Sequence, residues 1–123
     1  MSFEIHAHEA DAIVEVVYPA KPTQADVDDY VRRIHTMIEG GKLPAAKWKC
    51  LVDQRNLPVL PPELVNQLAT LNLYAQRHGM VKSARVVSTV VAGLQAQRMA
   101  REGQLPLSSF ETREEALAWL RKA

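Results

Sequence analysis

Polar residues suited to ligand binding stand at the ends of two predicted strands. Asp53, Arg55 and Asn56 end or follow the apolar segment 48–53, and Ser88 and Thr89 close the segment that begins at residue 83. Loops at the carboxyl ends of parallel strands are where open α/β sheets bind their ligands. Asp53 and Arg55 also precede a predicted helix N-terminus, which favours an anion. We therefore predict that these five residues form a binding site.

Each half of this candidate site has a structural alternative. Asp53 and Arg55 are close enough along the chain to form an ion pair within the loop, which would fix the connection without binding a ligand. Ser88 and Thr89 could serve only to cap the helix that follows them. The residue types alone leave both interpretations open.

A metal site is the second chemistry that the residue types suggest. His6 and His8 lie on one face of a predicted strand, where two imidazoles could chelate a transition metal. Such a site needs a third and a fourth ligand. The nearest acids, Glu4 and Glu9, do not supply them at a recognised spacing, so we expect a solvated polar strand face and no metal.

The single cysteine is a candidate nucleophile only if a histidine lies beside it and its pKa is lowered. Cys50 lies within an apolar strand, on the same side as Trp48 and Val52. We predict that it is buried as a small hydrophobic side chain. The glycines match neither a dinucleotide-binding motif nor a P-loop, and no hydrolase or zinc-protease motif is present. We expect no cofactor and no enzymatic activity.

Period-two and helical patterns predict five strands and four helices. The strands are expected at 3–7, 12–18, 48–53, 83–88 and 107–110, and the helices at 24–39, 62–78, 94–102 and from 113 onward. Strands that alternate with helices favour parallel pairing, with one antiparallel partner from the opening hairpin. The prediction is an α/β fold, with a single mixed, mostly parallel five-stranded sheet, an antiparallel N-terminal strand and about four helices.

Charged residues interrupt strands that would otherwise be apolar. Glu15, Lys47, Lys49 and Arg85 lie within or beside them, whereas parallel strands covered on both faces should read as continuous apolar runs. We infer a sheet face that is partly exposed or used for contact, and Glu15, Lys49 and Arg85 could make a mixed-charge surface there that pairs with its own two-fold copy. The opening strand is expected at a sheet edge, where unpaired backbone groups could extend a neighbouring sheet.

Length and composition fit one cytoplasmic domain spanning 1–123. Of the 123 residues, 47% are hydrophobic and 24% charged, which is typical of a globular domain. A formal net charge of +1 supplies no long-range attraction for nucleic acid. No apolar run approaches the roughly 20 residues that span a bilayer, and no secretory signal pattern is present. A single cysteine excludes an intramolecular disulfide and suits a reducing compartment.

Three segments of the chain carry a family resemblance. They are Leu-Val-Asp-Gln-Arg at 51–55, Ala-Arg-Val-Val-Ser at 84–88 and Phe-Glu-Thr-Arg-Glu-Glu-Ala-Leu-Ala-Trp-Leu at 110–120. The first is similar to a strand ending in Asp-x-Arg, the second to the next strand and the third to the C-terminal signature of the SpoIIAA-like branch of the STAS superfamily. The resemblance implies a single-domain regulatory protein without catalysis that acts through a protein partner.

The best-known relatives are anti-sigma-factor antagonists, in which a partner kinase phosphorylates a serine in the loop after the third strand. Residues 53–62 contain no Ser or Thr, so we expect no such switch there, and Ser88 or Thr89 is the alternative acceptor. The predicted function is a non-enzymatic regulatory or protein-interaction domain, with a homodimer as one form of contact. The alternative is a protein that binds a small apolar ligand or lipid, with Leu57, Val59 and Leu60 as a lid.

Overall fold

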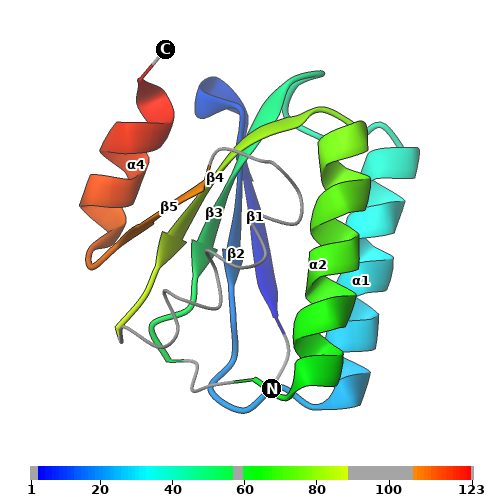
Figure 1. Cartoon of the computed structure of the whole chain (residues 1–123). Helices are drawn as coiled ribbons and strands as arrows, with labels where there is room; N and C mark the ends of the chain where they lie inside the picture. Colours follow the sequence, from blue (N-terminus) through cyan, green and yellow to red (C-terminus); the bar gives the residue numbers. More distant parts are fainter. Residues whose placement is uncertain (1–2, 57–59, 89–106, 123) are drawn as a thin grey trace.

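The computed structural model describes residues 3–56, 60–88 and 107–122, which form a five-stranded sheet with helices on both faces (Figure 1). The elements in chain order are β1 (Glu4–His8), a 3-10 turn (Glu9–Asp11), β2 (Ile13–Val17), α1 (Gln24–Glu39), β3 (Trp48–Asp53), α2 (Pro62–Arg77), β4 (Met80–Val86), β5 (Leu107–Phe110) and α4 (Arg113–Arg121). The strand order is β1-β2-β3-β4-β5, with β1 antiparallel to β2 and the other pairs parallel. The predicted α/β fold, with the opening strand at an edge, is confirmed.

Two apolar clusters attach the helices to the sheet. Helices α1 and α2 cover one face (Figure 1), where they pack on side chains that include Val14, Val16, Cys50 and Val52. Helix α4 lies over the other face, where it packs on Ile13, Leu51, Ala84 and Val86. Successive side chains of a strand point to opposite faces. The central strands are therefore buried on both sides.

Helix α1 begins where its capping pattern predicts. The Thr23 hydroxyl accepts a hydrogen bond from the Asp26 N–H at 3.1 Å, and the Asp26 carboxylate accepts one from the Thr23 N–H at 3.0 Å. The reciprocal pair satisfies backbone donors at the start of the helix. Val27, Tyr30 and Ile34 then turn into the core, and the predicted helix at 24–39 is confirmed.

Strand β4 begins three residues before the predicted start at residue 83, and it ends at Val86, within the margin of about two residues expected at the predicted end at residue 88. Met80 already pairs with Trp48 of β3. Gly79 immediately precedes this start, with a φ of +103°, and a Cβ there would lie 2.0 Å from the Ala46 carbonyl oxygen. The backbone crosses Ala46 too closely for any side chain, and pairing starts at the next residue. The predicted helix at 94–102 lies outside the described residues.

The charged residues of the strands do not share one surface. The register places Glu15 beside Leu51, which faces α4, and Arg85 beside Val52, which faces α1 and α2. Both charged side chains are buried, Glu15 at 7% and Arg85 at 1% exposure. The predicted mixed-charge contact surface of Glu15, Lys49 and Arg85 is therefore wrong, because sheet register and helix coverage separate its members.

Candidate functional site

Asp53 and Arg55 form a closed ion pair at the carboxyl end of β3. The Arg55 guanidinium donates to Asp53 Oδ2 at 2.8 Å, and Arg55 Nε and the Arg55 backbone N–H both donate to Oδ1 at 3.1 Å. Ser88 joins the same turn, because its hydroxyl donates to the Arg55 carbonyl at 2.8 Å. Asn56 is exposed in this turn, and Thr89 lies outside the described residues.

The charges of this pair compensate each other within the loop. Burial opposes ionisation of Asp53, but the hydrogen bonds from Arg55 bring its pKa below the usual range. The Asp53 carboxylate in turn raises the pKa of Arg55. The ion pair of the structural alternative is thus present within the turn after β3, and the Ser88 hydrogen bond connects this turn to the end of β4. Ligand binding by these residues stays a prediction.

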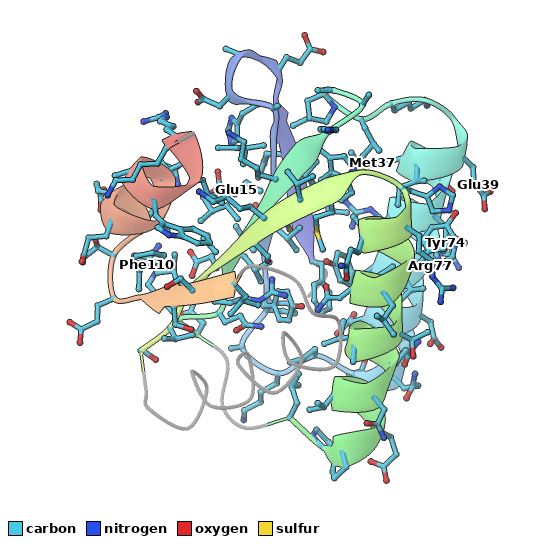
Figure 2. All side chains as sticks on the ribbon, turned by 45° about the horizontal axis from the view of Figure 1, so that its top comes forward. Glu15, Met37, Glu39, Tyr74, Arg77 and Phe110 are labelled. Carbon is cyan, nitrogen blue, oxygen red and sulfur yellow. The ribbon has the colours of Figure 1, made fainter. Side chains whose placement is uncertain are left out.

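A second charged cluster lies between the sheet and α4, where Figure 2 labels Glu15. Arg113, the first residue of α4, donates from Nε to Glu15 Oε2 at 2.8 Å and from Nη2 to Oε1 at 2.9 Å. The Nε2 of His8 on β1 lies 2.7 Å from Glu15 Oε1. The cluster therefore connects β1, β2 and the beginning of α4.

Arg113 keeps the Glu15 carboxylate ionised. Its hydrogen bonds lower the pKa of Glu15 to about 2 against the opposing effect of burial, and His8 contributes in the same direction. Glu15 also raises the pKa of Arg113. A carboxylate with so low a pKa is a weak general base. The arrangement anchors the beginning of α4 to the sheet.

The sequence reasoning did not identify Glu15 and Arg113 as partners. A signal was present, because an acid inside an apolar strand needs a counter-charge when it is buried. The choice of partner depends on how α4 folds back over the sheet, and the two residues are 98 positions apart. Arg113 was noticed only as part of the C-terminal signature.

Two lysines of the sheet hold the other end of α4. Lys49 Nζ donates to the Leu120 carbonyl at 2.9 Å, and Lys82 Nζ donates to the Trp119 carbonyl at 2.9 Å. The Lys82 ammonium also lies 4.3 Å from the Trp119 ring centroid. Cations stabilise the carbonyl end of a helix. Lys49 and Lys82 therefore help to dock α4 on the sheet.

The open edge of β1 carries outward-facing backbone groups. At the two ends of β2, the Ala12 carbonyl and the Tyr18 N–H both bond to β3. The direction in which backbone N–H and C=O groups point alternates along a strand. In β2, these groups therefore point toward β3 at even-numbered residues and toward β1 at odd-numbered residues. The antiparallel register pairs odd residues of β2 with even residues of β1. The N–H and C=O groups of Ile5 and Ala7 therefore point away from the sheet.

A groove of about 400 Å³ lies beside this edge, against α1. It is lined by Ile5, Ala7, Arg32, Arg33, Thr36, Met37 and Lys42. Met37 is labelled on α1 in Figure 2. Asp29 compensates part of the positive charge, since its carboxylate lies 2.6 Å from Arg32 and 3.6 Å from Arg33. The groove, which we call the β1–α1 groove, thus combines apolar side chains with a positive rim.

His6, His8 and Cys50 were the candidates for metal binding and nucleophilic chemistry. His8 bonds to Glu15, and His6 is 55% exposed beside Glu4. Within the described ranges, no group of three or more His, Cys, Asp and Glu residues could hold a metal ion. Cys50 is buried as predicted, and burial raises the pKa of its thiol to about 11. None of the helices in the described part of the chain is long and apolar enough to cross a membrane.

Comparisons with known proteins identify the fold. No protein-family model matches the chain, and no curated protein matches it. Among solved structures, it matches the crystal structure of an uncharacterized protein of the DUF3478 family with a SpoIIAA-like fold, from Shewanella loihica PV-4. The TM-score is 0.74 at 17% sequence identity, over 97% of this chain and 92% of the other. The chain therefore has a SpoIIAA-like fold, as its three signature segments predicted.

Proposed function

We propose that this chain is a non-enzymatic protein-interaction domain that binds an extended, acidic segment of a partner protein at the β1 edge. The observation that carries the proposal is the set of outward backbone groups at Ile5 and Ala7, beside the β1–α1 groove. A segment that adds to a sheet edge gains main-chain hydrogen bonds there, and neighbouring pockets select its side chains. Its carboxylates would meet the cations at positions 32, 33 and 42.

The charge of the groove favours an acidic partner over a second copy of the chain. Two β1 edges related by a two-fold axis would bring the same three cations from both copies to one interface. Like charges placed opposite one another oppose association. The homodimer is therefore the less favoured occupant of this edge.

The ionisation states of Glu15, Asp53 and Cys50 support a binding role without catalysis. An effective general base has a pKa near the working pH, whereas the pKa values of Glu15 and Asp53 are lowered. The raised pKa of Cys50 leaves its thiol protonated. The proposal includes a cytoplasmic, regulatory setting, which the single free cysteine supports.

A small apolar ligand is the alternative occupant of the β1–α1 groove, because Ile5, Ala7 and Met37 contribute apolar lining. The predicted lid does not support this alternative. Leu60 is 7% exposed and packs in the cluster beneath α1 and α2, while Leu57 and Val59 lie outside the described residues. Native mass spectrometry of the purified protein would reveal a co-purified ligand by its added mass.

A selection of random dodecapeptides displayed on phage tests the proposed partner chemistry. We expect enrichment of peptides in which apolar and acidic residues alternate. Fluorescence anisotropy then compares binding of a selected peptide to the wild type, Ala7→Pro and Lys42→Glu. Proline at position 7 removes an outward N–H while leaving the pairing with β2, and Lys42→Glu reverses a rim charge. Each change should weaken binding about tenfold or more.

Lys21→Glu is the matched charge control, because Lys21 is exposed before the start of α1 and does not line the groove. It should leave peptide affinity unchanged. Circular dichroism of every variant confirms that the fold is retained. The proposal is overturned if no acidic peptide is enriched, or if the selected peptides bind Ala7→Pro as tightly as the wild type.

A further inference from the structure

Three buried polar atoms that have no hydrogen-bond partner in the described part of the chain lie on one face of neighbouring strands. They are Arg85 Nε, Ser83 Oγ and Ser109 Oγ. Arg85 pairs in register with Ser109 of β5, and Ser83 is two positions earlier on β4. Residues paired across strands, or two apart along one strand, point to the same face. The three groups therefore form a cluster on the side of the sheet that α1 and α2 cover.

Arg85 is the charged member of this cluster, and it is 1% exposed. Among residues 3–56, 60–88 and 107–122, no carboxylate forms an ion pair with it. An arginine side chain stays protonated in proteins, and a buried charge is expensive unless it is paired. The buried guanidinium therefore requires an anion, and the described residues do not supply one.

The titratable groups on which the Arg85 charge acts are neutral. They are the buried Tyr18, Tyr30 and Cys50, and Cys50 also shares a side-chain hydrogen bond with Arg85. Burial raises the pKa of each of these three groups, so they remain protonated at neutral pH. None of them supplies the missing negative charge.

Glu15, on the opposite face of the sheet, is a buried charge with a structural role, and it provides a comparison for Arg85. Glu15 is almost as deeply buried, and it receives two hydrogen bonds from Arg113 and a contact from His8. Arg85 has no equivalent partner among the described residues. Its neighbours are instead two serine hydroxyls, which can both donate hydrogen bonds.

We propose that Arg85, Ser83 and Ser109 bind the oxyanion headgroup, a carboxylate or a phosphate, of a small ligand on the inner face of β4 and β5. The planar guanidinium offers paired donors that match the two oxygens of such a group. The hydroxyls supply further donors from both sides. This site lies at the other end of the sheet from β1, and it stands independently of the proposed peptide edge.

Side-chain NMR of the full chain labelled with 15N tests the site directly, because the Arg85 Nε–H gives its own resonance. The protein is titrated separately with octanoate and with inorganic phosphate, using chloride at matched ionic strength as the reference. We expect a saturable shift of the Arg85 Nε–H resonance with at least one of the two anions. A response to octanoate alone assigns a carboxylate ligand, and a response to phosphate alone assigns a phosphate ligand.

Arg85→Met should abolish the binding or weaken it at least tenfold, measured at neighbouring backbone amides. Arg77→Met, at an exposed arginine near the end of α2, should leave it unchanged. Glu102 is the only acidic residue between positions 89 and 106. The proposal is overturned if neither anion moves the Arg85 resonance. It is also overturned if Glu102→Gln shifts this resonance in the absence of any anion, because Arg85 then has an internal partner. The wild-type titration decides the matter even if Arg85→Met fails to fold.

Discussion

Glu15 is an acid in the middle of β2, and its ionisation is coupled to folding. Its pKa falls from an ordinary value of 4.5 to about 2, chiefly through the hydrogen bonds from Arg113. A carboxyl whose pKa is lower in the folded state stabilises the fold above its unfolded pKa. That contribution disappears as the pH falls through the folded pKa.

We predict that Glu15→Gln lowers the free energy of unfolding by about 3 kcal/mol at neutral pH. The difference from the wild type should shrink as the pH falls from 4.5 to 2, because the wild-type carboxyl becomes protonated in that window. Urea unfolding at a series of pH values measures it. Asp11→Asn is the control, since Arg121 and Asp11 form an exposed pair. Wild-type and Glu15→Gln stabilities that stay a constant distance apart across this pH range would contradict the assignment.

The candidate binding residues were only partly predictable from their types and spacing. Asp53, Arg55 and Ser88 do meet at the carboxyl ends of β3 and β4, as expected for parallel neighbours. The sequence left open whether Arg55 pairs with Asp53 or faces a ligand, because that depends on the local backbone of the turn. Glu15 and Arg113 were missed because their contact is set by tertiary structure.

At the scale of elements, α4 is a short helix held at both ends by charges from the sheet. Arg113 binds Glu15 at its beginning, and Lys49 and Lys82 donate to carbonyls near its end. Between them, Leu117 and Leu120 pack on the apolar face of the sheet. The polar contacts select one placement of the helix on a surface where apolar packing alone has less direction.

We predict that Lys82→Met lowers the free energy of unfolding by about 1 kcal/mol, because it removes the bond to the Trp119 carbonyl and the contact with the Trp119 ring. The Trp119 fluorescence should also change in the folded state. Lys21→Met, at an exposed lysine away from α4, should show neither effect. Equal stabilities of the two variants would show that Lys82 does not dock the helix.

The start of β4 yields a sharper prediction, because Gly79 has no room for a side chain. Gly79→Ala should cost about 3 kcal/mol or more, since the new Cβ would meet the Ala46 backbone at a positive φ. Gly41→Ala has a φ of +67° but open space around it, and should cost only about 1 kcal/mol. Thermal unfolding of both variants measures the difference. A Gly79→Ala protein as stable as Gly41→Ala would contradict the close crossing.

Strand and helix types were predictable, because local patterns determine them. Alternation indicated β1, the capping pattern at Thr23 indicated α1, and the apolar run indicated β3. The beginning of β4 was not predictable in this way. Val81 and Lys82 do not resemble a buried strand, and their pairing follows from the turn at Gly79. The faces of Glu15 and Arg85 required the register of three strands.

At the scale of the whole molecule, helices cover both faces of the sheet, whereas the β1 edge carries the outward backbone groups of Ile5 and Ala7. The positive rim of the β1–α1 groove opposes pairing of two copies. We predict that sedimentation at micromolar concentration shows a monomer. Lys42→Glu reduces the repulsion between edges, and it should either leave the monomer unchanged or permit weak association. A wild-type dimer that Ala7→Pro disrupts would show that a second copy, and not an acidic partner, occupies the edge.

The most direct test of the central claim is amide hydrogen exchange, measured by NMR, of the wild-type protein with and without a selected acidic peptide. If the peptide adds to the sheet, the outward amides of Ile5 and Ala7 gain hydrogen bonds. We predict strong new protection at these two residues and little change at 54–56. Protection that appears at 54–56 and Ser88, with Ile5 and Ala7 unchanged, would contradict the edge-binding account and favour a site at the ends of β3 and β4.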